Sequence, residues 1–301
     1  MSLLNLLISK SIMYVPGSVV HIFSKKYIAG EKLIDAVKSV ETLNKKGMMS
    51  TIDILGEEVK TEHDAIFYKN FYIDVLNHIE KEHLDANISL KPTQLGLSIK
   101  QELALDNITE VIKHAKKLNN FVRIDMENCP YTDDILQIYL DLKKEYDNVG
   151  IVLQSYLRRT ISDIEQLPKN GLNVRLCKGV YNEARMLAYK DPSIINKNYL
   201  YALEKLFELK AYVGIATHDE KLIFESMRLI DKYNLNTDNY EFQMLLGVDE
   251  NLRDMILNAG HKLRTYVPFG KEWLSYSKRR LKENPNIARH ALRQLFDIHG
   301  D

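Results

Sequence analysis

The sequence of 301 residues contains only two cysteines, Cys129 and Cys177, and neither lies in a CxxC pair or at a spacing typical of a metal site. They provide no disulfide framework, which indicates a reducing compartment such as the cytoplasm. Charge of one sign is also lacking, because 41 basic residues balance 41 acidic ones. No overall field attracts nucleic acid or anionic lipid, so any anion must be bound by a local site.

Long hydrophobic runs and phosphate-binding loops are missing as well. The N-terminal stretch MSLLNLLISKSIMYVPGSVV is apolar, but Asn5, Ser9 and Lys10 interrupt it and no basic region or cleavage site follows the signal-peptide pattern. We expect residues 1–45 to form a helical arm that packs on the main domain or on another subunit, with peripheral membrane contact as the alternative. Neither a Walker motif nor GxGxxG occurs.

The sequence does contain a regular alternation of short apolar runs with longer amphipathic segments. Apolar residues make up 45% of the chain and charged residues 27%, as in an average globular protein. The alternation predicts strand–helix units in a parallel sheet, and about eight strands would close a (βα)8 barrel over residues 46–301. The predicted strands are MMSTIDIL, NISLKP, FVRIDM, VGIVLQS, NVRLCKG, YVGIATH, YEFQMLL and KLRTYVP.

Two of the segments between these strands have a clear helical period. TISDIEQL and DEKLIFESMRLIDKYNL carry apolar residues every three or four positions. Ser162 with Glu165 is the predicted cap of the first helix, and Asp219 or Glu220 begins the second.

Polar side chains stand at the end of nearly every predicted strand. Because the carboxyl ends of parallel strands open onto one face of a barrel, we expect these side chains to converge on a binding face. For any single residue, the polar beginning of a loop is an equally good explanation. The set comprises Glu57, Lys91, Asp125, Glu127, Gln154, Ser155, Arg175, Lys178, Thr217, His218, Gln243 and Tyr266.

The motif NVRLCKG suggests a ligand site at one of these strand ends. Arg175 offers a planar donor fork, Lys178 a point charge, and Gly179 a backbone that a ligand can approach closely, which suits a phosphate or an electron-rich ring. Ion-paired barrel residues are the structural alternative. His218, at another strand end, has no second histidine at useful spacing, so a metal site is not expected.

Two other chemistries remain open on the residues alone. A lysine with a lowered pKa can form a Schiff base with a carbonyl substrate, and Lys91 and Lys178 are the candidates. Asp125 and Glu127 lie on the same side of an extended segment and are candidates for acid–base work, although an aspartate paired with a neighbouring cation is equally natural.

The stretch YSKRRLKE near the C-terminus brings charge together by helical spacing. On a helix, Tyr276, Arg279, Arg280 and Glu283 lie three or four residues apart and share a face. Both arginines can therefore reach one anionic group, although an exposed and solvated patch is the commoner fate of such a run.

Eight motifs follow one another from about Lys91 to Glu283: LKPTQLGL, VRIDMENCP, GIVLQSYLRRT, RLCKGVYNE, ATHD, EFQMLLGV, YVPFGKEW and RRLKE. In this order they resemble the monofunctional bacterial proline dehydrogenases, FAD-dependent and distorted (βα)8 TIM-type barrels related to the dehydrogenase domain of bifunctional proline utilisation proteins. The resemblance implies oxidation of L-proline to Δ1-pyrroline-5-carboxylate, the first step of proline catabolism to glutamate. Hydride would pass to FAD N5 and the electrons onward to a membrane quinone, at the inner face of the cell membrane.

The resemblance also implies the residues that hold the cofactor. Arg175 would lie beside flavin N5, and Asp125 matches the family's active-site aspartate, which would orient neighbouring basic groups. The remaining flavin contacts would be Met126, Gln154, Lys178, Gly179, Val180, Thr217 and His218.

For the substrate, the resemblance implies a carboxylate clamp beneath a late helix that covers the active site. Lys91, Arg279 and Arg280 would bind the proline carboxylate, and Glu283 would orient the two arginines. The space around the ring would be shaped by Tyr181, Leu245 and Tyr266. A non-catalytic sensor or subunit that only binds proline or flavin is the remaining alternative, and the sequence does not fix the oligomeric state.

Overall fold

The computed structural model describes residues 20, 24, 26–56, 58–274 and 276–278. Eight parallel strands form a closed barrel in chain order, and β8 closes the barrel by pairing with β1. All eight predicted strands are confirmed, with ends that shift by a few residues. They are β1 (Met49–Ile54), β2 (Ala86–Leu90), β3 (Val122–Ile124), β4 (Val149–Gln154), β5 (Asn173–Cys177), β6 (Tyr212–Ala216), β7 (Tyr240–Leu245) and β8 (Leu263–Phe269).

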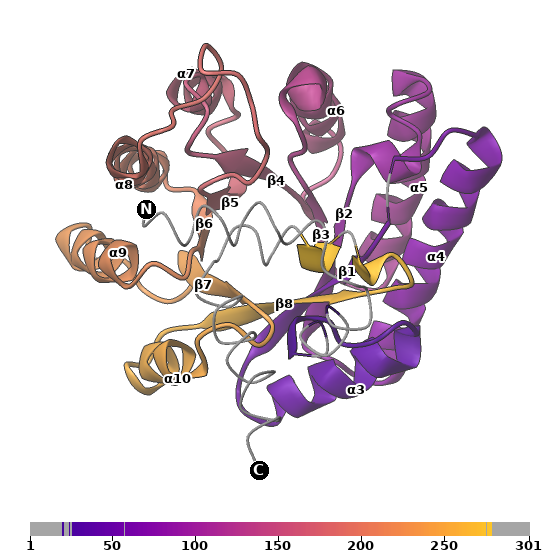
Figure 1. Ribbon diagram of the computed structural model, residues 1–301, viewed down its shortest axis with the longest axis horizontal. Coiled ribbons are helices and arrows are strands. Elements are labelled where there is room, and N and C mark those ends of the chain that lie inside the picture. The colour runs from indigo at the N-terminus through magenta and orange to yellow at the C-terminus, as the bar shows by residue number, and fades with distance from the viewer. Residues whose placement is uncertain (1–19, 21–23, 25, 57, 275, 279–301) are drawn as a thin grey trace, which may run out of the picture.

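Helices surround the barrel as an outer layer (Figure 1). Their apolar faces and the outward side chains of the strands form one continuous core. The helices are α3 (Leu33–Asn44), α4 (Glu62–Lys81), α5 (Gln101–Lys117), α6 (Thr132–Lys143), α7 (Thr160–Gln166), α8 (Pro192–Glu208), α9 (Glu220–Lys232) and α10 (Glu250–Asn258), with short 3-10 turns η2 (Pro92–Leu95) and η3 (Cys129–Tyr131).

The two helix starts that the sequence singled out differ in outcome. Asp219 is the N-cap of α9, and its side chain accepts a hydrogen bond from the Lys221 amide, as predicted. The prediction for Ser162 is wrong, because α7 begins at Thr160 with Arg159 as N-cap and no side-chain cap. Ser162 lies inside the first turn, where its hydroxyl donates to the Arg159 carbonyl.

Helix α3 precedes the first strand and is packed firmly on the barrel. Its Ala36, Val40 and Leu43 belong to the main hydrophobic core. The predicted boundary at residue 45 falls between α3 and β1, and the division into an arm and a barrel domain stays a prediction. Among the residues that the structure describes, no helix has the length and apolar character needed to cross a bilayer.

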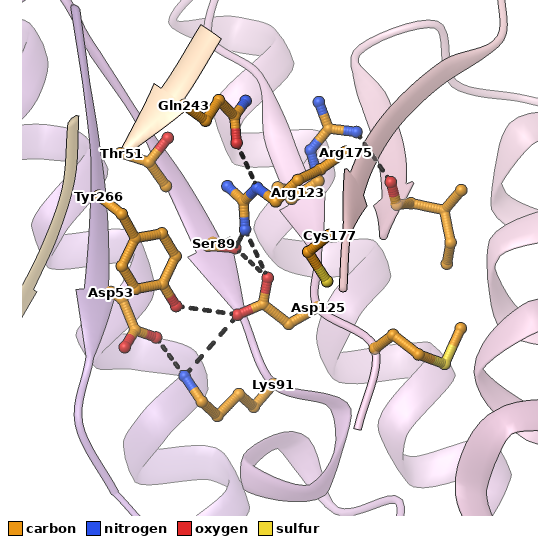
Figure 2. Close-up of polar contacts among 12 residues, drawn as sticks. Thr51, Asp53, Ser89, Lys91, Arg123, Asp125, Arg175, Cys177, Gln243 and Tyr266 are labelled. Atoms are coloured by element: carbon orange, nitrogen blue, oxygen red, sulfur yellow. Dashed lines mark hydrogen bonds and ion pairs between the residues drawn. The ribbon is translucent and has the colours of Figure 1, made fainter. Parts of the chain in front are cut away.

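Each strand is buried on both of its faces, but the two faces differ in chemistry. On β1, Ile52 and Ile54 face the helices and belong to the core, whereas Thr51 and Asp53 alternate with them and bond to residues of the next strand. The same alternation on the other strands fills the barrel interior with polar side chains (Figure 2). The site described below occupies the carboxyl end of this interior.

Candidate active site

Asp125, one residue beyond β3, lies at the centre of a cluster of polar side chains in the barrel mouth (Figure 2). One carboxylate oxygen, Oδ1, accepts hydrogen bonds from Ser89 Oγ at 2.5 Å and from Arg175 Nη1 at 2.8 Å. The other, Oδ2, accepts from the Tyr266 hydroxyl at 3.0 Å. Four strands therefore contribute to one hydrogen-bonded cluster, and the predicted convergence of Asp125, Arg175 and Tyr266 is present in the structure.

Lys91 joins this cluster from the end of β2 and is held by two carboxylates. Its Nζ forms an ion pair with Asp53 and lies 3.8 Å from Asp125 Oδ2. Burial alone would lower the pKa of Lys91, but the two carboxylates outweigh it and raise the pKa above its ordinary value. Schiff-base chemistry needs the opposite shift, so the geometry disfavours that alternative for Lys91.

Arg175 is fixed on two sides and open on the third. Its Nε donates to Gln243 Oε1 at 2.6 Å, and its Nη1 donates to Ser89 and Asp125. Its guanidinium carbon lies 5.1 Å from the centre of the Tyr266 ring, close enough for a cation–π contact. Within the described part of the chain, Nη2 makes no hydrogen bond, so Arg175 keeps one donor group available for a ligand.

Gln154, at the end of β4, holds the neighbouring loop and leaves an acceptor unused. Its Nε2 donates to the Met126 carbonyl at 3.1 Å and contacts the Glu127 carbonyl at 3.4 Å. Its Oε1 is buried and has no partner among the described residues. A buried acceptor of this kind is costly unless a ligand supplies a donor, which fits the predicted flavin contact.

Lys178 follows β5 and is anchored to the next strand end. Its Nζ forms an ion pair with Asp219 Oδ2 at 2.7 Å, and Asn196 donates to the same oxygen at 3.0 Å. The Asp219 amide in turn donates to Thr217 Oγ1 at 3.1 Å. Lys178 and Thr217 therefore lie side by side on the rim, as their assignment to one cofactor requires.

Gly179 is needed for a reason that the sequence did not reveal. Its φ of +103° belongs to the region that favours glycine, and a Cβ atom there would lie 2.2 Å from the Tyr156 ring. The close approach in this structure is thus between backbone and Tyr156. Val180 and Tyr181 follow in the same loop, where Val180 is 43% exposed and Tyr181 lies near enough to Lys91 to contribute to its raised pKa.

His218 positions the end of β7. Its Nε2 accepts a hydrogen bond from the Leu245 amide at 2.8 Å, which places the ring proton on Nδ1 when the imidazole is neutral. The contact links two residues that were assigned separately to the cofactor and to the substrate. Within the described ranges, no group of three or more histidine, cysteine or carboxylate side chains is arranged to hold a metal ion.

Two of the strand-end residues have structural partners instead. Glu127 accepts from the Thr93 amide at 2.9 Å and from Thr93 Oγ1 at 2.6 Å, which fastens η2 to the end of β3. Burial raises the pKa of Glu127. The Ser155 carbonyl accepts from Asn198 at 2.7 Å, which ties β4 to α8. Asp125 and Glu127 thus have separate partners, and the structure gives no support to a joint acid–base pair.

Some predicted residues lie outside the described part of the chain. They are Glu57, Arg279, Arg280 and Glu283. Conversely, sequence reasoning missed Asp53 and Ser89, which complete the cluster. Both carried a signal, since Asp53 is the one charged residue of β1 and Ser89 stands two positions before Lys91 on the same face.

Known proteins are similar to this chain in sequence. The sequence model of the family described as "Proline dehydrogenase" matches residues 36–291. Proline dehydrogenase 1 of Bacillus subtilis (strain 168) is 32% identical over 273 residues, which cover 91% of this chain and 90% of that protein. Proline dehydrogenase 2 of the same strain is 35% identical over 264 residues, 87% of each chain.

A solved structure is similar in fold. It is proline utilization A (PutA) from Bdellovibrio bacteriovorus inactivated by N-propargylglycine, which superposes with a TM-score of 0.81 at 26% identity. The match covers 86% of this chain but 32% of that one, so this chain spans about a third of the larger protein. The likeness extends to the closed barrel of eight parallel strands.

Proposed function

Since this chain belongs to the proline dehydrogenase family and acts in the first step of proline catabolism, we propose that it oxidises L-proline with FAD as the hydride acceptor. The product is Δ1-pyrroline-5-carboxylate, formed when the ring loses a hydride from carbon and a proton from nitrogen. A quinone is the proposed final electron acceptor. The observation that carries the proposal is the Arg175 Nη2 donor at the barrel mouth, together with the buried Gln154 Oε1, neither of which has a hydrogen-bond partner among the described residues.

The residues around the mouth fit a flavin ring. An isoalloxazine offers both acceptors and a donor along one edge, which matches an open guanidinium nitrogen and a buried amide oxygen. Bound FAD would supply the hydride acceptor. Arg175 and Gln154 would hold the ring, and the remaining contacts would come from Met126, Lys178, Gly179, Val180, Thr217 and His218.

Charge balance explains why the substrate needs further cations. Asp53 and Asp125 carry two negative charges, and Lys91 and Arg175 carry two positive ones, so the described cluster is neutral overall. A cluster that is neutral and already paired offers little net attraction to the carboxylate of a substrate. Arg279 and Arg280 would supply the missing positive charge and would bind the proline carboxylate together with Lys91, with Glu283 fixing the orientation of the two arginines.

The other residues assigned to the substrate would position the proline ring. Tyr266 is held by Asp125 and packs against Arg175, so its ring makes a rigid wall of the site. Tyr181 and Leu245 would complete the apolar surface. Asp125 orients Arg175, Tyr266 and Lys91 through charged contacts and is not assigned as a base, because the secondary amine can lose its proton to solvent.

Anaerobic titration with L-proline tests the proposal. The purified protein, loaded with FAD, should be yellow and should lose the visible flavin absorption when L-proline is added. Glycine betaine, which has a carboxylate but no ring hydride donor, is the control and should cause no bleaching. A protein that cannot be reconstituted with FAD, or that stays yellow with saturating proline, would contradict the proposal.

Repeated turnover distinguishes an enzyme from a non-catalytic sensor. With an artificial electron acceptor in excess, the enzyme should consume many equivalents of proline for each bound flavin. Tight flavin binding with a single bleaching event and no further turnover would favour the sensor.

The proposed quinone acceptor bears on where the protein acts in the cell. We propose a cytoplasmic protein that meets its quinone at the inner face of the membrane through peripheral contact. Co-sedimentation with anionic vesicles, with and without quinone, should show binding that high salt reverses if the contact is electrostatic.

A further inference from the structure

The Arg175 side chain stands at the mouth end of a hydrogen-bonded chain that continues into the barrel interior. Its Nε donates to Gln243 Oε1, and Gln243 Nε2 donates in turn to Glu241 Oε1 at 2.6 Å. Glu241 Oε1 also accepts from Arg264 Nε at 2.7 Å, and Glu241 Oε2 accepts from the Tyr212 hydroxyl at 2.8 Å. Glu241 and Gln243 are two residues apart on β7, so both project into the barrel interior.

This hydrogen-bonded chain allows the Gln243 amide only one orientation. A carboxylate can only accept, so the amide nitrogen of Gln243 must face Glu241. A guanidinium can only donate, so the amide oxygen must face Arg175 Nε, which lies 2.6 Å away. Reversing the amide would place donor against donor at one contact and acceptor against acceptor at the other.

Glu241 keeps the acceptor character that this orientation needs. Burial would raise its pKa, but Arg264 and the hydrogen bonds from Arg264, Tyr212 and Gln243 outweigh burial and lower it. With 2% of its surface exposed, Glu241 lies well inside the barrel and is not a ligand contact.

A glycine in the barrel wall, Gly214, leaves room for the Gln243 side chain. Gly214 on β6 faces Gln243, and a Cβ atom added to Gly214 would lie 2.4 Å from Gln243 Nε2. An alanine there would push the amide out of its place, because such a distance is far below van der Waals contact. The sequence thus provides a glycine in the middle of a strand for the Gln243 side chain.

We propose that Glu241 is a positioning residue of the oxidation reaction: through Gln243 it fixes the Arg175 guanidinium so that Nη2 is presented to the mouth. This role rests on the proposed flavin site above. Arg175 is clamped from one side by Asp125 and from the other by Gln243, and without Glu241 the Gln243 amide loses the acceptor that holds its nitrogen in place.

The main test replaces the buried ion pair by apolar side chains of similar length. The double variant Glu241→Met with Arg264→Met removes the acceptor without leaving an unpaired buried charge, which favours folding. We expect kcat for proline to fall by about 10-fold, because small misplacements of a positioned group are costly. The midpoint potential of bound FAD should also become more negative, since a less ordered cation stabilises the reduced flavin less.

Two conservative variants separate positioning from stability. Glu241→Gln keeps an oxygen acceptor facing Arg264 and Gln243, so kcat and potential should return close to wild-type values. Tyr212→Phe removes the hydrogen bond to the other oxygen, so the melting temperature should fall while kcat and potential stay unchanged. If Tyr212→Phe lowered kcat and potential as much as the double variant, the role of Glu241 would be structural only.

Gln243, in the middle of the hydrogen-bonded chain, gives a test that leaves the Glu241–Arg264 ion pair intact. A wild-type result at this position overturns the proposal even if the double variant does not fold. Gln243→Met should lower kcat and potential by the same amount as the double variant, and combining all three changes should cause no further loss. Wild-type kcat and potential in Gln243→Met would overturn the proposal, as would fully additive losses.

The outcome is distinguishable from failure of the proposed function. If L-proline does not bleach the wild-type flavin, the proposed oxidation itself fails. If wild-type bleaching is normal and the double variant and Gln243→Met match it in rate and potential, only the role of Glu241 is overturned.

Discussion

The barrel interior holds two groups of buried charge that use the same residue types in different ways. The mouth cluster consists of Asp53, Ser89, Lys91, Asp125, Arg175 and Tyr266, and the deep cluster of Arg123, Asn173, Tyr212, Glu241 and Arg264. In the deep cluster both oxygens of Glu241 are occupied by neighbours from the chain. In the mouth cluster the Arg175 Nη2 donor stays open, and the side chains of Lys91 and Asp125 are 17% and 14% exposed. Arg123 Nε in the deep cluster also lacks a partner among the described residues, but it is buried. Buried charge therefore indicates direct contact with a ligand only where unused bonding capacity lies within reach of the mouth.

Asp125→Asn should give the largest effect, because it disturbs three contacts of the mouth cluster at once. The amide can keep its oxygen toward Ser89 and Arg175 only by turning its NH2 group toward Tyr266 and Lys91. The Tyr266 hydrogen bond must then reverse, and the negative charge between Lys91 and Arg175 is lost. We expect kcat/KM for proline to fall by about 100-fold. Steady-state kinetics with an artificial acceptor, together with the flavin content, measure this. Full activity would remove the central residue from the mouth cluster.

Lys91→Met should act mainly on substrate binding. A charged hydrogen bond contributes about 2 kcal/mol, so KM for proline should rise by about 30-fold with a smaller change in kcat. Because removing Lys91 alone leaves Asp53 buried without its partner, the variant is best made together with Asp53→Asn. Asp53→Asn alone is the matched control and should keep a KM within a few-fold of the wild-type value. An unchanged KM in the double variant would place the carboxylate elsewhere.

Arg123→Met should have the opposite signature, since Arg123 serves the deep cluster. Its Nη1 donates to the carbonyls of Ile151 and Asn173 at 3.0 and 2.9 Å, and its Nη2 donates to Asn173 Oδ1 at 2.5 Å. Burial lowers the pKa of Arg123 to about 9, which still leaves it charged at neutral pH. We expect the free energy of unfolding to fall by about 1–2 kcal/mol in denaturant titrations. A large loss of kcat at normal stability would erase the distinction between the clusters.

The smallest expected effect is a pH dependence of stability from Glu241. Its pKa is lowered in the folded state, so its stabilisation is fully present above the pKa of the unfolded chain and is lost as the pH falls through the folded value. Glu241→Gln cannot titrate. The melting temperatures of wild type and Glu241→Gln should therefore converge as the pH is lowered from 7 towards 3. A gap that widens in acid would mean that the pKa is raised instead.

The barrel and its mouth were within reach of sequence reasoning. Strands buried on both faces read as short apolar runs, and their regular alternation with helices gave both the strand number and the converging ends. Residues such as Asp125 and Arg175 could be placed at the mouth because each stands at or near a strand end. The flavin and substrate roles of individual residues came from the family motifs and stay predictions.

Contacts set by strand register were not within reach. Asp53 pairs with Ser89 across β1 and β2, which places Lys91 within reach of the Asp53 carboxylate, but nothing in either strand fixes that register locally. The orientation of Gln243 likewise depends on Glu241, Arg175 and the space at Gly214, three different strands. The cap at Ser162 failed because the turn before α7 is folded by Thr160, whose hydroxyl donates to the Gln154 carbonyl at 2.6 Å.

The most direct measurement compares two buried arginines of the same barrel. Arg175→Met and Arg123→Met, each loaded with FAD, are mixed anaerobically with saturating L-proline in a stopped-flow instrument. We predict that Arg123→Met bleaches at the wild-type rate and that Arg175→Met bleaches at least about 100-fold more slowly, as when one oriented donor is removed from a reacting centre. Equal rates in the two variants, or slower bleaching in Arg123→Met, would contradict the division between a mouth cluster that serves the reaction and a deep cluster that supports it.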